Sequence, residues 1–141
     1  MICRLRDESG QALLIAVGFT LIAFAVAGVA VDGARMFLLR RGLQSSVDAA
    51  SMVAASQLDE DALYSTSERN SRLDPLAAMT EARVFVAQRG VADRLEVRVE
   101  RDVVVLRATA RLRTSFLGLV GVEELTVAAD ASAAPVFGEA P

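Results

Sequence analysis

The first part of the chain contains a long uncharged run that merges into a helical pattern. Residues 12–31 comprise eleven Leu, Ile, Val or Phe, six Ala, two Gly and one Thr. Twenty apolar residues in a helix match the roughly 30 Å hydrocarbon core of a bilayer. The apolar region of a cleaved signal peptide is shorter, about 7–15 residues. Here the pattern also continues beyond the run without a proline. It therefore predicts a transmembrane anchor, not a removed signal.

Beyond Asp32 the apolar positions narrow to one face of a helix. They recur every three or four residues, which is the spacing of an amphipathic helix. We therefore expect one helix over residues 11–58, whose first half crosses a membrane and whose second half packs on protein. The predicted stripe consists of Leu39, Leu43, Val47, Ala50, Ala54 and Leu58.

Residues 59–74 lose this pattern and are rich in Asp, Glu and Ser, as in an exposed linker. The acidic triplet at 59–61 lacks the alternation and the glycine of a calcium loop, so a solvated helix end is favoured. A second helix is expected over 75–89, because Asp74 suits an N-cap, Pro75 the first helical position and Gly90 the C′ position. Its predicted apolar face consists of Ala78, Met79, Ala82, Phe85 and Val86.

The remaining residues alternate between apolar and polar positions, which is typical of half-buried strands. Three such runs cover about 95–99, 104–112 and 125–133, with Arg101 and Asp102 as a tight hairpin. Residues 115–121 resemble a short helical or looped crossing. A three-stranded antiparallel sheet with one apolar face needs a cover, and both helices can supply it. The predicted fold class is α+β.

Composition argues against catalysis and nucleic-acid binding. The net charge is −3 and the basic residues are scattered, so no nucleic-acid partner is expected. The chain has no His, and its one cysteine, Cys3, precedes the apolar run and leaves no intramolecular disulfide. No nucleophile elbow and no glycine-rich phosphate loop is present. We expect no enzyme activity, no cofactor and no metal.

Small and charged residues in the first helix are candidate helix–helix contacts. Asp32 ends the apolar run, and a carboxylate near membrane depth is by default a functional candidate. Its expected partner is Arg35, three residues later, in a local ion pair, or alternatively a neighbouring subunit. Close approach of another helix is expected at small residues. The candidate contact set is Gly18, Ala23, Ala27, Gly28, Asp32 and Arg35.

Several segments together resemble the TadE/TadG-like proteins of tight-adherence (Flp) pilus assembly. These are DESGQA at 7–12, AGVAVDGAR at 27–35 and LQSSVDAASMVAA at 43–55. The tail segments FLGLVG at 116–121 and VAADASA at 127–133 also resemble the C-terminal strand of that family. The resemblance implies a pilin-like arrangement, in which a long N-terminal transmembrane helix packs with a second helix on a three-stranded antiparallel sheet.

The resemblance also implies a location and partners. It suggests a bacterial inner-membrane protein whose partners are the lipid bilayer and other pilus or secretion-system subunits, as a homo- or hetero-oligomer. The expected organisation is a cytoplasmic head (1–10), the helix (11–58), the linker (59–74) and a small extracytoplasmic domain (75–141). Arg4 and Arg6 precede the span whereas Arg35, Arg40 and Arg41 follow it, so charge alone does not set the orientation.

Proteolytic removal of the N-terminal head distinguishes two functional hypotheses. Gly10 and Gln11 match the cleavage point of processed pilins, in which the fifth mature residue is usually Glu. Here that residue is Ile15, which cannot pair with the amine of a neighbouring subunit and fits the unprocessed TadG-like branch better. One hypothesis is a minor pseudopilin that joins or primes the pilus. The other is an unprocessed, anchored binding module that does not enter the filament.

Overall fold

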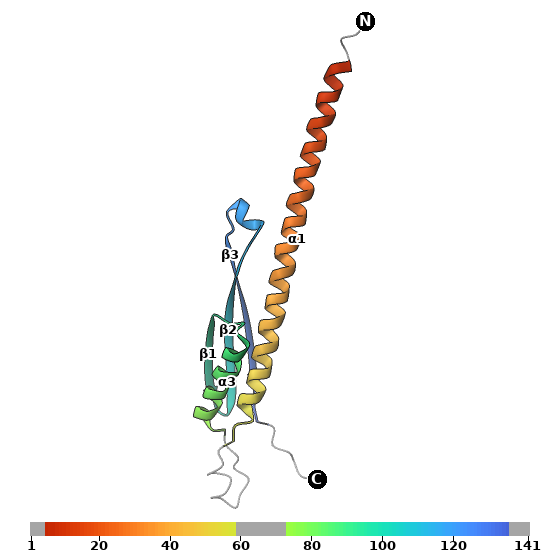
Figure 1. Cartoon of the computed structure of the whole chain (residues 1–141). Coiled ribbons are helices and arrows are strands. Elements are labelled where there is room, and N and C mark those ends of the chain that lie inside the picture. The colour runs from red at the N-terminus through yellow and green to blue at the C-terminus, as the bar shows by residue number, and fades with distance from the viewer. Residues whose placement is uncertain (1–4, 59–72, 136–141) are drawn as a thin grey trace, which may run out of the picture. The chain divides into compact units, whose positions relative to one another are not determined.

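The computed structural model of the protein describes residues 5–58 and 73–135 (Figure 1). The helices are α1 (Leu5–Ala55), α3 (Pro75–Arg89) and the short 3-10 helix η1 (Leu117–Val120). The strands are β1 (Arg94–Glu100), β2 (Val103–Arg113) and β3 (Glu124–Ala133), which form one sheet in the order β1-β2-β3. The predicted α+β fold is confirmed, with a long apolar first helix, a second helix and a three-stranded antiparallel sheet.

The predicted linker falls mostly on residues that the structure does not describe. Residues 59–72, including the acidic triplet at 59–61, lie outside the described ranges. At the edges of this gap, Leu58 and Leu73 form an isolated antiparallel bridge, and the Asp74 N–H donates to the Gln57 carbonyl at 3.0 Å. The backbone just before this gap is therefore hydrogen-bonded to the backbone just after it.

The chain divides into two compact units. The first unit comprises α1 up to Arg35 together with Arg113–Leu125. The second unit comprises Met36–Leu112 and the chain from Thr126 onward.

In the second unit, α3 has the ends that its sequence predicts. The Asp74 side chain accepts hydrogen bonds from the backbone N–H groups of Leu76 and Ala77, at 2.9 and 3.1 Å. These bonds satisfy donors that have no partner inside the helix. Gly90 ends the helix with φ +61°, in the left-handed region that favours glycine. The helix predicted over 75–89 is therefore confirmed.

The β1–β2 hairpin keeps most of the apolar residues of both strands on one face. Its turn residues, Arg101 and Asp102, both have positive φ (49° and 67°), as a two-residue turn compatible with strand twist requires. In the resulting register Val97 pairs with Leu106. Side chains alternate across a strand, so the buried positions of β2 lie at every second residue.

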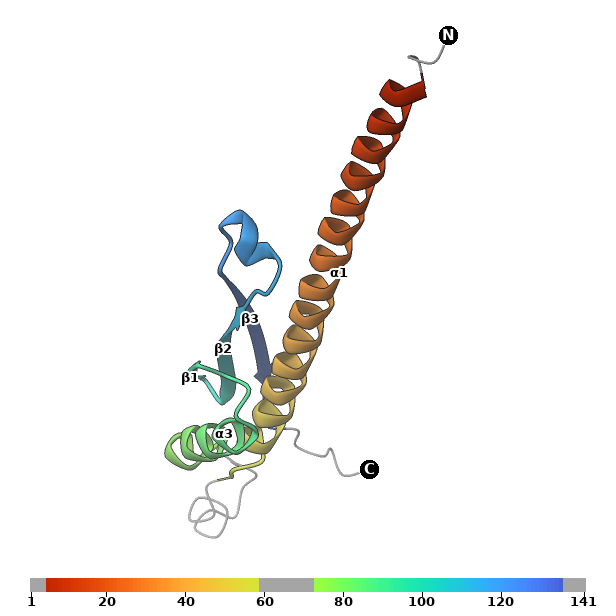
Figure 2. The same ribbon diagram turned by 45° about the horizontal axis from the view of Figure 1, so that its top comes forward.

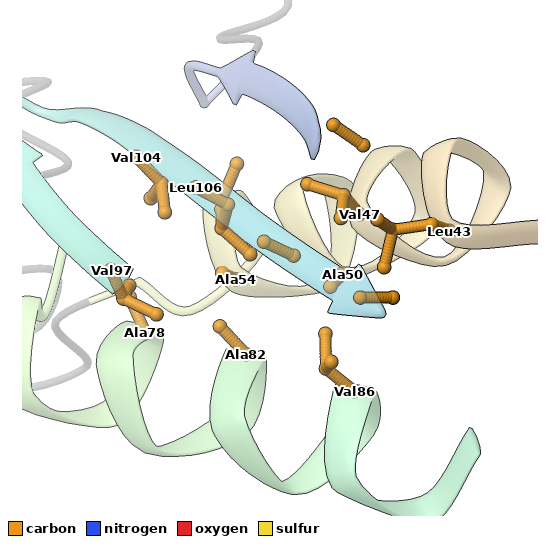
Figure 3. Close-up of a cluster of buried hydrophobic side chains, with 14 of the residues drawn as sticks. Leu43, Val47, Ala50, Ala54, Ala78, Ala82, Val86, Val97, Val104 and Leu106 are labelled. Carbon is orange, nitrogen blue, oxygen red and sulfur yellow. The ribbon is translucent and has the colours of Figure 1, made fainter. Parts of the chain in front are cut away.

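Two helices cover this apolar face and complete the core (Figures 2 and 3). The second part of α1 contributes a stripe that matches the predicted one from Leu43 to Ala54, whereas Leu39 is half-buried and Leu58 is exposed. From α3, the predicted Met79 and Phe85 are only partly buried. The completely or almost completely buried side chains drawn and labelled in Figure 3 are Leu43, Val47, Ala50, Ala54, Ala78, Ala82, Val86, Val97, Val104 and Leu106.

In the first unit, the apolar part of α1 is uncovered over most of its surface. The large apolar side chains of residues 13–31 are 47–76% exposed. Helix α1 is long and apolar enough to cross a membrane. Burying so much apolar surface in lipid is favourable, at about 25 cal/mol per Å². These properties fit single-pass membrane anchoring.

Candidate functional site

The Asp32 carboxylate is a densely bonded side chain of the first unit. Although it lies at the end of the apolar run of α1, its side chain is completely buried. Oδ2 accepts from the backbone N–H groups of Phe116 and Leu117, both at 2.8 Å. The Ser115 N–H donates to both carboxylate oxygens, at 3.0 and 3.2 Å. Three consecutive N–H groups of a loop more than eighty residues away therefore converge on one carboxylate.

The local fold of the loop explains why these donors are available. Residues 115–117 enter η1, and the first N–H groups of a helix have no acceptor within it. Phe116 occupies the N-cap position, but its side chain makes no capping bond. A carboxylate is the favourable group at this end, since it accepts hydrogen bonds and complements the helix dipole. Asp32 thus caps η1 from another element.

Arg35 adds a side-chain contact to the same loop. Its guanidinium donates from Nη1 to Oγ of Ser115 at 2.8 Å. The same nitrogen lies 3.8 Å from Oδ1 of Asp32. The ion pair expected from the three-residue spacing is therefore present but long, and the backbone donors lie much closer to the carboxylate. Arg35 remains 46% exposed, so the pair with Asp32 contributes little stability.

Gly28 allows the loop to approach the helix. It is buried, and a Cβ at this position would lie 2.5 Å from Cγ of Phe116 and 2.6 Å from that residue's Cβ and Cδ1. Real Cβ atoms do not come this close to other carbon atoms, so any larger residue would displace Phe116. Gly28, Asp32 and Arg35 are spaced by four and three residues, which places them on one face of α1. We call this set and its partners, residues 115–117, the Asp32 cradle.

Hydrogen bonds within residues 114–123 keep the loop in shape. The Thr114 N–H donates to the Glu123 carbonyl at 3.0 Å, and the Thr114 hydroxyl donates to the Val122 carbonyl. The Val122 N–H donates to the Leu117 carbonyl at 3.0 Å. Gly121 turns the chain with φ +90°. The predicted short helical crossing is therefore a closed loop around η1.

Only part of the predicted contact set meets in this site. The structure brings together Gly28, Asp32 and Arg35, but their partner is a loop of the same chain. Ala23 and Ala27 are exposed, and nothing lies within 4 Å of a Cβ placed on Gly18. Gly10 and Gln11, the candidate processing residues, are exposed within α1. Contact with a neighbouring helix and processing after Gly10 stay predictions.

Sequence reasoning missed Ser115, Phe116 and Leu117. They act through backbone N–H groups, which every residue except proline carries, so no side chain marks them. The available signals were indirect: a carboxylate at the end of an apolar run, and a glycine four residues before it.

This arrangement fixes a loop to a helix and offers little to a substrate. Four N–H···O contacts reach the Asp32 carboxylate, three of them at Oδ2 and one at Oδ1. Its side chain is also closed to solvent. Among the described residues, no group of three His, Cys, Asp or Glu could hold a metal ion. What the contacts show is an attachment of residues 115–117 to α1.

Comparison with known proteins agrees with the resemblance seen in the sequence. Residues 10–57 match the family model described as putative Flp pilus-assembly TadE/G-like. The matched segment includes the helical half of the Asp32 cradle and the buried stripe of α1. No curated protein and no solved structure matches the chain. The family match supports a role in Flp/Tad pilus assembly, suggests a structural function and fits membrane and pilus partners.

Proposed function

We propose that this chain is a minor pseudopilin or a membrane-anchored assembly component of a Flp/Tad-type pilus or a related secretion system. It acts by helix packing and protein–protein contacts, not by catalysis. In this proposal residues 1–10 form a cytoplasmic head, and α1 crosses the bacterial inner membrane. The domain from residue 75 onward lies outside the cytoplasm, beyond the linker at 59–74.

The observation that carries this proposal is the uncovered apolar surface of α1 inside the family-matched segment. Water is a poor solvent for a contiguous apolar surface of this size, so lipid or other helices must cover it. Small residues allow close approach of a second helix, and Gly18, Ala23 and Ala27 remain accessible for that contact. A subunit of a helical assembly needs both an apolar helix surface and small residues at which a second helix can approach.

The second candidate function is an unprocessed accessory protein that stays in the membrane. Ile15 favours it, because an apolar side chain at that position cannot neutralise the N-terminal amine of a neighbouring subunit. Ile15 is 51% exposed, on the part of α1 that the proposal places in lipid. In this case the domain outside the membrane contacts other secretion components and the head is retained.

Deleting the gene and counting surface pili tests the general proposal, which predicts loss of pili and recovery with the wild-type chain. Unchanged pilus number would refute both candidate functions. Mass spectrometry of the N-terminus in pilus and membrane fractions then separates them. A chain beginning at Gln11 supports the pseudopilin, and an intact head supports the accessory protein.

A matched pair of variants sharpens this experiment. Gly10→Ala changes the residue before the cleavage point, and Gly33→Ala makes the same change elsewhere in α1. Nothing lies within 4 Å of a Cβ at either position, so neither substitution meets a steric obstacle. The pseudopilin predicts that only Gly10→Ala blocks processing and assembly. The accessory protein predicts that both variants support assembly equally.

A further inference from the structure

Residues 114–123 expose apolar side chains that the core does not use. Leu119 is 83% and Val120 is 76% exposed, and Phe116 and Val122 are about 40% exposed. All four lie in or beside η1, between the polar residues Arg113 and Glu123. A compact soluble domain rarely exposes such a cluster without a partner.

The Asp32 cradle fixes the depth of this loop relative to the apolar run. Its backbone N–H groups bond to Asp32, the residue that directly follows the run, and Phe116 packs on Gly28, which lies inside it. Four helical residues correspond to about 6 Å along the axis. The loop therefore overlaps the last turn of the apolar run, and the two elements belong to the same unit and lie side by side (Figures 1 and 2).

Most backbone N–H groups of the loop already have acceptors, which lowers the cost of placing them in a poorly hydrated environment. Polar backbone groups without partners are costly in contact with lipid. The N–H groups of seven residues have acceptors within the first unit: Thr114, Ser115, Phe116, Leu117, Leu119, Gly121 and Val122. Arg35 and Arg113 lie at the polar margin of the loop, where guanidinium groups can contact lipid phosphates.

We propose that the apolar tip of residues 114–123 enters the bilayer surface beside the end of the transmembrane helix, as a second membrane contact. The partner is the phospholipid boundary between headgroups and acyl chains, because the tip continues the apolar surface of the membrane anchor at its edge. Interfacial segments bury apolar side chains at this depth, about 5–10 Å into the boundary. The inference rests on the membrane anchor of the proposed function.

Depth-dependent fluorescence quenching of the full chain in vesicles tests this proposal. Cys3→Ser removes the only cysteine, and single cysteines are then introduced at three positions. Leu119→Cys reports the loop tip, Leu21→Cys the middle of the apolar run, and Leu76→Cys an exposed site on α3. Each is labelled with an environment-sensitive fluorophore in vesicles of phosphatidylethanolamine and phosphatidylglycerol. The quenchers are nitroxide lipids carrying the label near the headgroup or deep in the acyl chain, and aqueous iodide.

The expected result is several-fold stronger quenching of the Leu119→Cys probe by the shallow nitroxide than of the Leu76→Cys probe. The Leu21→Cys probe should respond most to the deep nitroxide, and the Leu76→Cys probe mainly to iodide. Adding Asp32→Ala should shift the loop probe toward the iodide response, because the loop then loses its attachment to α1.

Two outcomes would overturn the inference while the anchor stands. In the first, Leu21→Cys is quenched by lipid but Leu119→Cys behaves like Leu76→Cys. In the second, Leu119→Cys is shielded from iodide without lipid quenching, so protein, such as a second copy, covers the tip. If the Leu21→Cys probe also escapes lipid quenching, the membrane anchor fails, and the proposed function fails with it.

Discussion

Leu43 lies where α1 becomes part of the folded domain, so its truncation tests how the second unit is built. Its side chain is completely buried among the core residues of α1, α3 and the sheet (Figure 3). Leu38, five residues earlier on the same helix, is 65% exposed. Because the substitution Leu→Ala is chemically identical at both sites, Leu38→Ala controls for changes in helix propensity.

The expected cost of Leu43→Ala follows from its burial. Losing a buried leucine side chain costs its transfer free energy plus the cavity left behind, about 2–5 kcal/mol in total. Leu38→Ala should change the stability by less than about 0.5 kcal/mol, the usual limit for surface positions. Since a small domain is stable by only about 5–15 kcal/mol, the loss at Leu43 is a large fraction.

Hydrogen exchange of the β2 amides in the full chain, reconstituted in lipid nanodiscs, measures this loss. The apolar half of α1 stays in lipid and does not enter the comparison. Where exchange requires unfolding of the domain, Leu43→Ala should accelerate it by roughly 30-fold to several thousand-fold, since about 1.4 kcal/mol is tenfold. Equal exchange in Leu43→Ala and Leu38→Ala would show that α1 does not form the core of this domain.

Three further substitutions, with Gly33→Ala as a control, probe individual contacts. Asp32→Ala should accelerate exchange of the three loop amides that it binds while leaving the β2 amides unchanged, and unaltered loop exchange would contradict the cradle. Gly28→Ala should destabilise the first unit by about 1–3 kcal/mol through overlap with Phe116. Gly33→Ala meets no obstacle and should stabilise α1 by up to about 1 kcal/mol. Faster amide exchange in Gly33→Ala than in Gly28→Ala would exclude the packing of Phe116 on Gly28. Asp74→Ala should lower the stability of α3 by about 0.5–2 kcal/mol, because it removes the N-cap. Amide exchange in the first turn of α3 should then be faster, and unchanged exchange there would refute the capping role.

The elements whose ends have local chemical signals were predictable from the sequence. Asp74, Pro75 and Gly90 mark α3 because caps act within a few residues of the helix. The alternation of apolar and polar residues along each strand likewise indicates which face of the sheet is buried. The turn at Arg101 and Asp102 carries no glycine, yet both residues adopt positive φ, since the strong alternation of the flanking strands sets the register.

The partners of Asp32 were not predictable in this way. Charge and spacing suggest Arg35, which is near in sequence, but the carboxylate accepts from backbone groups that carry no sequence label. Finding them requires knowing that the β2–β3 connection returns to α1, which is a property of the tertiary fold. The two glycine positions differ for the same reason: Gly28 faces Phe116, whereas Gly33 faces nothing within 4 Å.

The proposed function requires that α1 crosses a membrane and that the domain built on its second half lies on the other side from the head. Labelling with a membrane-impermeant maleimide in bacterial spheroplasts tests it most directly. Two forms of the full chain are compared: the native chain, whose only cysteine is Cys3, and Cys3→Ser with Leu76→Cys. The account predicts that Leu76→Cys is labelled in intact spheroplasts and that Cys3, in chains that retain residues 1–10, is labelled only after lysis. Labelling of Cys3 before lysis, or protection of Leu76→Cys until lysis, would contradict it.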